Sequence, residues 1–285
     1  MKVLVMGGGV IGVTSAWQLL KDGHEVTLVE RLGGAADETS FGNAGAIAPG
    51  HAYAWSSPKA PRTLLRSLWR NDQSIRFRFS LDPKLWHWTL QFLGQCTTER
   101  YRRNTQNKHR LCAYSKAMLH EVVAETGIDY DRTGGSILYI YRDRASFENR
   151  IREMAILTDL GEDLRALEPG AVVAAEPALA AAEEKIAGAI HALGDETGDC
   201  HKFTQALAAL CQAKGATVKY NTAVTGIVAT GDRVEKVMTD KGDEVADAYV
   251  MSMGFDSPTF SKPLGMRLPI YPIKGYSVTL PVDQS

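Results

Sequence analysis

The sequence predicts an α/β fold organised around parallel strands, and two observations lead to this prediction. A fully apolar run at residues 3–6 leads directly into the glycine-rich segment 7–12, a helical pattern at 10–21 and a strand-like run at 25–30. Helical and strand-like segments alternate again between residues 203 and 252. This order of elements indicates a Rossmann-like nucleotide-binding domain, and the block between its two parts indicates an inserted α+β domain.

The glycine-rich segment fits the pattern G-x-G-x-x-G at Gly7, Gly9 and Gly12. The first glycine allows a tight turn, the second lets the backbone approach a pyrophosphate, and the third lets helix and strand pack closely. Phosphates then bind to the free N–H groups at the helix N-terminus. Glu30 ends the second strand, where a carboxylate accepts hydrogen bonds from ribose hydroxyls and disfavours a 2′-phosphate. The pattern predicts a dinucleotide site but does not distinguish FAD from NAD.

The segment that follows, residues 31–50, is rich in glycine, alanine and small polar residues. A simple NAD domain usually continues into another helix at this point. Small side chains instead allow close approach to a flat ligand, and Thr39, Ser40 and Asn43 can donate hydrogen bonds to phosphate or ribityl oxygens. The segment therefore favours a flavin, and a surface loop is the alternative interpretation.

The run at residues 38–50 (Glu-Thr-Ser-Phe-Gly-Asn-Ala-Gly-Ala-Ile-Ala-Pro-Gly) resembles the flavin loop of the small subunit of bacterial D-amino-acid dehydrogenases. These belong to the glycine oxidase and D-amino-acid oxidase group of FAD enzymes. Further similar segments follow in the family's order at 133–138, 176–179, 195–200, 247–251 and 271–277. The resemblance implies a D-amino-acid-oxidase-like fold, with an FAD-binding domain at 1–50 and 195–258 and a substrate domain at 51–194 and 259–285.

The residues implied to contact FAD lie in the glycine loop, at the end of the second strand, in the flavin loop and in two later segments. They are Val5, Met6, Gly7, Gly8, Gly9, Val10, Ile11, Gly12, Glu30, Arg31, Thr39, Ser40, Asn43, Ala44, Gly45, Ile47, Val224, Ser252, Met253 and Gly254. In the similar family, the backbone at Val224 meets the adenine, and the turn 252–254 returns to the cofactor.

The implied reaction is the oxidative deamination of a small D-amino acid such as D-alanine. A hydride passes from Cα to flavin N5, the imino acid hydrolyses to a 2-oxo acid and ammonia, and a respiratory acceptor such as a quinone takes the electrons. Two alternatives remain open: an oxidase of the same fold acting on glycine, sarcosine or proline-type amines, and a non-catalytic flavin-binding fragment or subunit.

Candidates for catalysis are His51 and Tyr53, which follow the flavin loop, and Tyr271, Lys274 and Tyr276, which we expect in a strand beside the active site. A cation such as Lys274 can hold the substrate carboxylate, and a tyrosine can donate a hydrogen bond to it. Nothing in the sequence resembles a metal site or a nucleophilic triad.

The remaining regular elements are predicted from periodicity and from turn residues. We expect helices at 83–95, 100–125, 146–160 and 203–214, and strands at 136–141, 217–220, 222–227, 232–240 and 245–252.

Composition limits the partners and the compartment. Net charge is -1 with a pI near 6.7, which gives no bulk attraction to nucleic acid. The four cysteines are widely spaced, which favours free thiols in a reducing compartment over disulfides or a zinc site. The N-terminus does not resemble a signal peptide, so we expect a cytoplasmic protein.

One segment has a strong local charge bias. Residues 59–116 contain thirteen Lys or Arg against three acidic residues, and four of the five tryptophans lie in or beside this segment. Basic residues interleaved with tryptophan suit an anionic membrane surface, here the inner face of the cytoplasmic membrane. The alternative is a solvated basic face with the tryptophans in the core.

The strand-like run at 276–280 is followed by no segment that can pair with it, and open sheet edges are usually avoided. Members of the similar family continue into a substantial C-terminal segment, which completes the substrate domain and closes over the flavin. We therefore expect a chain truncated at its C-terminus, with the missing part either absent or supplied by a second polypeptide.

Overall fold

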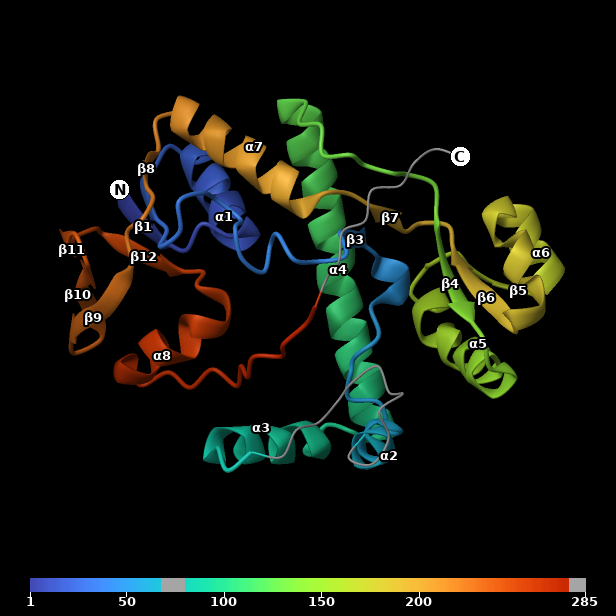
Figure 1. The fold of residues 1–285 in the computed structure, drawn as a ribbon. Coiled ribbons are helices and arrows are strands. Elements are labelled where there is room, and N and C mark those ends of the chain that lie inside the picture. Colours follow the sequence, from blue (N-terminus) through green and yellow to red (C-terminus); the bar gives the residue numbers. More distant parts are fainter. Residues whose placement is uncertain (68–79, 277–285) are drawn as a thin grey trace. The chain divides into compact units, whose positions relative to one another are not determined.

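The computed structural model describes residues 1–67 and 80–276 (Figure 1). The chain divides into two compact units. The first contains Met1–Gly45, Ile128–Asp131 and the chain from Asp199 onward, and the second contains Ala46–Gly127 and Arg132–Gly198.

A four-stranded parallel sheet is the centre of the first unit. Its order is β12-β1-β2-β8, formed by Ala248–Met251, Lys2–Met6, Glu25–Val29 and Thr217–Lys219. The side chains at positions 3–6 of β1 are all buried. A central parallel strand is covered on both faces, which explains why this run is apolar without alternation.

Two helices cover one face of this sheet, and Figure 1 shows them side by side: α1 (Val10–Lys21) and α7 (Cys200–Ala213). Helix α1 buries Val13, Ala16 and Trp17. Helix α7 begins three residues earlier than the sequence predicted because the side chain of Asp199 accepts a hydrogen bond from the Lys202 N–H (2.9 Å). An aspartate cap of this kind satisfies a backbone donor that has no partner within the helix.

A smaller antiparallel sheet packs on the first. It has the order β11-β10-β9, formed by Gly242–Glu244, Arg233–Thr239 and Val224–Thr230. Leu4 and Met6 of β1 pack in one cluster with Val237 of β10. Since alternate side chains of a strand point to opposite faces, this sheet and the helices cover opposite faces of β1.

The chain after β12 forms η3 (Gly254–Asp256), α8 (Ser257–Ser261) and η4 (Lys262–Leu264). Residues 265–276 then have no regular secondary structure. The strand expected at 271–276 is therefore wrong for the described residues. No strand of the described chain pairs with this segment, and Pro272 has no N–H to donate to a ladder.

The second unit is built on an antiparallel sheet of order β4-β6-β5, formed by Ile137–Tyr141, Gly188–Ala192 and Leu164–Leu167. A short pair joins β3 (Ala46–Ile47) to β7 (Glu196–Thr197). The core of this unit contains Tyr53, Tyr101, Phe147, Leu157, Leu164, Ile190 and Ala192.

The described part of the second unit has helices close to the three predicted at 83–95, 100–125 and 146–160, and four further short helices that the sequence did not predict. In chain order, the helices are η1 (Pro49–His51), α2 (Ala60–Arg66), α3 (Pro83–Gly94), α4 (Thr98–Thr126), α5 (Arg144–Thr158), α6 (Pro169–Ala175) and η2 (Pro177–Lys185). Side chains of Asp82, Thr97 and Asp143 cap α3, α4 and α5, and Gly127 ends α4 at φ +69°.

The predicted α/β class is confirmed, but the two units have other bounds than the predicted domains. Residues 46–50 and 195–198 belong to the second unit because β3 pairs with β7 and Asp195 binds the Gly50 N–H. The described part of 259–285 belongs to the first unit, where several of its residues line a cavity.

None of the described helices combines the length and the hydropathy needed to cross a bilayer. Within residues 1–67 and 80–276, no group of three or more His, Cys, Asp or Glu side chains is placed to hold a metal ion.

Candidate cofactor site

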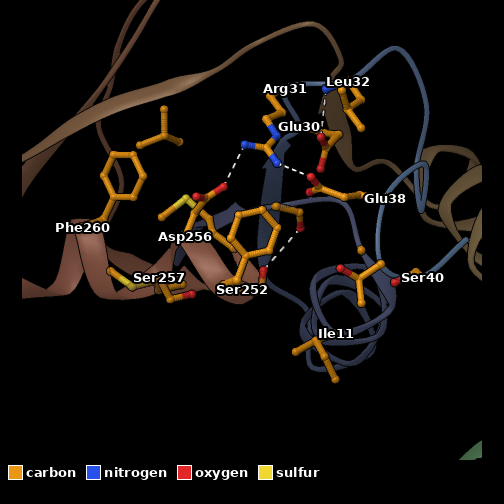
Figure 2. Close-up of a pocket in the computed structure, with 18 of the residues that line it drawn as sticks. Ile11, Glu30, Arg31, Leu32, Glu38, Ser40, Ser252, Asp256, Ser257 and Phe260 are labelled. Carbon is orange, nitrogen blue, oxygen red and sulfur yellow. Dashed lines mark hydrogen bonds and ion pairs between the residues drawn. The ribbon is translucent and has the colours of Figure 1, made fainter. Parts of the chain in front are cut away.

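A cavity of about 910 Å³ opens in the first unit at the carboxyl ends of β1, β2 and β12 (Figure 2). It is lined by residues 7, 9–11, 29–32, 36–40, 222–224, 251–257, 259–260 and 270–273. Ligands of open parallel sheets bind at this edge, where the loops after the strands converge.

The glycine loop leaves no space for side chains at two of its positions. Gly7 has φ +104°, and a Cβ atom there would lie 2.7 Å from the carbonyl oxygen of Ser252. At Gly12, a Cβ atom would overlap the carbonyl oxygen of Gly7 and lie 2.8 Å from Ser252 Oγ. The Ser252 hydroxyl, directly after β12, in turn donates to the carbonyl oxygen of Met6 (2.7 Å) and ties the glycine loop to this turn.

The N-terminus of α1 faces this cavity. Its N-cap, Gly9, provides no side-chain acceptor, and the Val10 N–H donates to Ser40 Oγ (3.0 Å). The amides of Ile11 and Gly12 have no acceptor among the residues that the structure describes. Free amides and the helix dipole together favour an anion at this point.

Glu30 lies at the end of β2, with its carboxylate at the cavity (Figure 2). One carboxylate oxygen accepts from the Gly8 N–H (2.6 Å) and the other from the Leu32 N–H (2.8 Å). Each oxygen keeps further acceptor capacity, so the carboxylate is fixed in position and can still accept from hydroxyl groups of a ligand.

Arg31 points across the cavity toward two carboxylates, as Figure 2 shows. Its guanidinium donates to Glu38 (2.5 Å) and to Asp256 (2.7 Å), and it lies 5.9 Å from the centre of the Phe255 ring. The hydrogen bond to Glu38 is the main cause that raises the pKa of Arg31 above its usual value.

The loop from residue 36 to 45 is held by contacts of its own. The Ala36 N–H donates to the Gly8 carbonyl oxygen. Asp37 Oδ1 lies 3.0 Å from Nε2 of His201 at the start of α7. The side chain of Asn43 is used within the loop, since it accepts from the Gly45 N–H (2.8 Å) and donates to the Ser40 carbonyl oxygen (2.6 Å).

Twelve of the twenty predicted FAD residues line the cavity: Gly7, Gly9, Val10, Ile11, Glu30, Arg31, Thr39, Ser40, Val224, Ser252, Met253 and Gly254. The other eight lie elsewhere. Val5 and Met6 are buried in β1, Gly8 and Gly12 are buried in the glycine loop and α1, and Asn43, Ala44 and Gly45 follow the lining part of the flavin loop. Ile47 belongs to β3 of the second unit.

Sequence reasoning missed the residues after Gly254 that complete the wall. Phe255, Asp256, Ser257, Thr259 and Phe260 line the cavity from η3 and α8. The available signal is that they follow the turn 252–254, which the resemblance assigns to the cofactor.

His51, one of the predicted catalytic residues, lies in η1 of the second unit. Its ring stacks on Tyr139 at 4.0 Å and meets Tyr53 edge-on at 5.6 Å. The Tyr139 hydroxyl donates to Asp195 (2.9 Å), which also accepts from the Gly50 N–H (2.8 Å). Burial, together with the charges of Arg150 and Lys108, lowers the pKa of His51 to about 4.

Tyr53 is a core residue of the second unit, with 7% of its surface exposed. The Arg150 guanidinium lies 4.1 Å from the centre of its ring, and burial raises the pKa of Tyr53 to about 12. The hydroxyl is therefore protonated throughout the physiological range.

The three late candidates lie in the first unit. Tyr271 lines the cavity, whereas Lys274 and Tyr276 are exposed and outside its lining. The Lys274 ammonium lies 5.2 Å from the centre of the Tyr276 ring.

Known proteins resemble this chain in sequence and in fold. The family model described as FAD dependent oxidoreductase matches residues 2–285. D-amino acid dehydrogenase of Paramagnetospirillum magneticum is 46% identical over 284 residues, which cover 99% of this chain and 67% of that protein. The corresponding enzyme of Methylobacterium radiotolerans is 44% identical over 286 residues, covering 100% of this chain and 68% of that protein.

Among solved structures, glycine oxidase from Geobacillus kaustophilus has a TM-score of 0.66 at 22% identity, covering 93% of this chain and 58% of that one. L-proline dehydrogenase from P. horikoshii has a TM-score of 0.61 at 18% identity, covering 93% of this chain and 56% of that one. The chain thus spans about two thirds of its curated relatives and less of these structures. The similarities confirm the resemblance and the fold expected from the sequence.

Proposed function

The chain belongs to the family of FAD-dependent oxidoreductases and is homologous to D-amino acid dehydrogenases, and we propose that it binds FAD in the cavity at its glycine loop and serves the oxidative deamination of D-amino acids. The products are a 2-oxo acid and ammonia. The observation that carries this proposal is the cavity itself, because its wall combines a helix N-terminus without a side-chain cap and a fixed carboxylate at the end of β2.

The residues present fit FAD. Gly7 and Gly12 leave no room for a Cβ atom, so backbone approaches backbone closely where the pyrophosphate would bind. The amide of Ile11, which lines the cavity, supplies a donor for its oxygens, and Glu30 supplies acceptors for the hydroxyls of the adenosine ribose. Ser40 and Thr39 would then face the pyrophosphate and ribityl chain.

FAD, when bound, supplies the two-electron acceptor, which takes a hydride from the substrate Cα at flavin N5. The chain's own residues orient the substrate. Lys274 is proposed to pair with its carboxylate and Tyr271 to donate a hydrogen bond to it, with Tyr276 as a further candidate. His51 and Tyr53 of the second unit are proposed as further catalytic candidates. With a pKa near 4, His51 is neutral at physiological pH and can accept a hydrogen bond, and the Tyr53 hydroxyl is protonated.

The absorbance spectrum of the purified chain tests this proposal. Flavin bands that D-alanine bleaches and L-alanine leaves unchanged are the expected result. A colourless protein that FAD does not reconstitute contradicts the proposed cofactor, and bleaching by L-alanine alone contradicts the proposed chirality.

Steady-state kinetics test the role of Lys274. Lys274→Ala is expected to raise KM for the amino acid while leaving the flavin bound, since Lys274 does not line the cavity. Lys236→Ala is the matched control, because Lys236 pairs with Asp243 in the small sheet and lies outside the cavity lining. Unchanged kinetics for Lys274→Ala would remove this residue from the substrate site.

The electron acceptor separates a dehydrogenase from an oxidase of the same fold. We propose a quinone of the respiratory chain, since the relatives at 44% and 46% identity are named dehydrogenases. Reduction of a dye or quinone without formation of hydrogen peroxide is expected. Stoichiometric peroxide in air would instead support a glycine, sarcosine or proline-type amine oxidase.

Contact with an anionic membrane surface on the cytoplasmic side is proposed for the basic, tryptophan-rich segment. Helix α3 exposes Trp86 (38%) and Leu90 (68%) one turn apart, next to Lys84. Trp69, Arg70, Arg76 and Arg78 of this segment lie outside the described residues. Vesicles containing phosphatidylglycerol are expected to bind the chain at low salt, and Leu90→Ser to weaken binding more than Val245→Ser on an exposed site of the first unit. No binding at low salt refutes the contact.

A further inference from the structure

Two adjacent residues at the end of β2 predict different ligands for the cavity, one with free ribose hydroxyls and one with a 2′-phosphate. An acidic residue at this position binds free ribose hydroxyls, as proposed for Glu30, whereas a nearby arginine commonly binds a 2′-phosphate. Arg31 directly follows Glu30, and both line the cavity. Glu30 disfavours a phosphorylated ribose, whereas an unpaired Arg31 would favour one, so the outcome depends on the partners of Arg31.

The partners of Arg31 resolve this conflict. One guanidinium nitrogen donates to Glu38 in the flavin loop (2.5 Å), and the other terminal nitrogen donates to Asp256 in η3 (2.7 Å) (Figure 2). These two carboxylates come from different segments and approach different nitrogens. Both terminal nitrogens of the guanidinium thereby have a carboxylate partner, and the combined charge of the two carboxylates exceeds that of the arginine.

The other charged groups of the cavity wall are also acidic. Among the described residues, its lining contains four carboxylates, from Glu30, Asp37, Glu38 and Asp256, and one guanidinium, from Arg31. Asp37 lies 3.0 Å from His201, whereas Glu30 accepts only from backbone amides in the described chain. Donors for an anion are concentrated at the N-terminus of α1, where the pyrophosphate is proposed to bind, and the region around Glu30 is negative.

We propose that the ion-pair network Glu38–Arg31–Asp256 determines nucleotide specificity. It withdraws Arg31 from ligand phosphates and, together with Glu30, restricts the cavity to adenine dinucleotides with free 2′- and 3′-hydroxyls. Phosphorylated nucleotides such as NADPH are thereby excluded from the flavin site. The inference rests on the proposed function only in that the cavity must bind an adenine dinucleotide.

Competition with FAD for the full chain tests this proposal. The probes are ADP-ribose and 2′-phospho-ADP-ribose, which differ only in the 2′-phosphate, and the readout is the concentration of each that displaces half of the bound FAD. For the wild-type chain, we expect ADP-ribose to compete roughly 100-fold better, because like charges brought together at a binding site are strongly unfavourable.

The variant Glu38→Gln/Asp256→Asn keeps the size of both side chains and frees the guanidinium. It is expected to reduce the preference for ADP-ribose over 2′-phospho-ADP-ribose to less than about tenfold. An Arg31 without its two carboxylate partners can pair with the added phosphate. Asp243→Asn/Glu244→Gln is the matched control, since it removes the same charge from β11, outside the cavity lining, and is expected to keep the wild-type preference. Arg31→Ala added to the freed variant is expected to restore the preference.

Equal competition by the two probes on the wild-type chain overturns the specificity inference. An unchanged preference for ADP-ribose in Glu38→Gln/Asp256→Asn overturns the role of the network. The single variant Glu38→Gln removes only one of the two ion pairs and measures the same preference a second time. In both cases FAD and ADP-ribose still bind, so the proposed flavin site stands. If neither FAD nor ADP-ribose binds the wild-type chain, the proposed function fails and the specificity inference fails with it.

Discussion

Replacing Gly12 by alanine sets two physical effects against each other in helix α1. Alanine is favoured over glycine within a helix by about 1 kcal/mol, so helix propensity alone predicts a more stable protein. The geometry of the glycine loop predicts the reverse. The new methyl group would overlap the carbonyl oxygen of Gly7 and lie 2.8 Å from Ser252 Oγ.

The atoms in the way cannot move independently. Gly7 is held at φ +104° between β1 and α1, and Ser252 is bound to the carbonyl oxygen of Met6 through its hydroxyl at 2.7 Å. Overpacking against fixed backbone costs about 1–3 kcal/mol, so the net effect is a loss of roughly 0–2 kcal/mol of unfolding free energy. Because relief requires α1 to shift away from the loop, flavin affinity is expected to fall more than stability, by at least about tenfold.

The assay combines urea denaturation with a flavin titration of the desalted chain. Gly23→Ala is the matched control, because Gly23 follows the other end of α1 with φ +78° and nothing lies within 4 Å of a Cβ atom there. This control carries backbone strain of about 1–2 kcal/mol without a clash, so it should lose stability and keep its flavin affinity.

One result would refute the reasoning. The result is a Gly12→Ala chain that is more stable than the wild-type chain and binds FAD equally well. Helix propensity would then outweigh the clash in unfolding free energy, and the close approach of α1 to the glycine loop would have no part in cofactor binding.

Two further predictions concern the buried groups around η1 in the second unit. Asp195→Ala leaves the Gly50 N–H and the Tyr139 hydroxyl without their acceptor and should cost about 1–3 kcal/mol for each donor in urea unfolding, whereas Asp195→Asn should cost less. Burial raises the pKa of Asp195, so its stabilising contribution is present below the unfolded pKa and is lost as pH rises through the folded pKa. The wild-type chain should therefore lose stability relative to Asp195→Asn as pH rises above about 4, and parallel curves would contradict this. Burial lowers the pKa of His51 from 6.5 to about 4, so its contribution is present above pH 6.5 and lost as pH falls toward 4, by up to about 3 kcal/mol. His51→Gln should flatten this acid-side loss, and an unchanged profile would show that His51 is not the group responsible.

The parts of the fold that the sequence predicts well are those fixed by neighbouring residues. Helix α1 has the predicted bounds, Val10–Lys21, because the glycine loop and Asp22–Gly23 terminate the helical pattern on both sides. The same local information places Glu30 at the end of β2, where its carboxylate is held by the amides of Gly8 and Leu32. Periodicity and turn residues are sufficient for the position of Glu30, whereas its contact with Gly8 joins residues 22 positions apart and was not predicted.

The rest of the site depends on residues that are distant in sequence. Asp256 lies 225 positions after Arg31, and nothing around either residue indicates that they form an ion pair. The strand expected at 271–276 fails for a related reason, because apolar residues form a strand only where a partner strand is present. Local pattern therefore predicts which segments contribute to the cavity but not which side chains meet across it.

The segments 38–50 and 195–200 illustrate how a distant contact explains local sequence. Each resembles the same family separately, and only the first has an evident reason in cofactor chemistry. In the structure, Asp195 accepts from the Gly50 N–H across 145 positions, and a Cβ atom at residue 50 would lie 3.0 Å from both carboxylate oxygens. Glu196 and Thr197 also pair with Ile47 and Ala46. The second segment thus positions the end of the first, which explains why glycine stands at position 50 and why the acidic residue opposite it is buried.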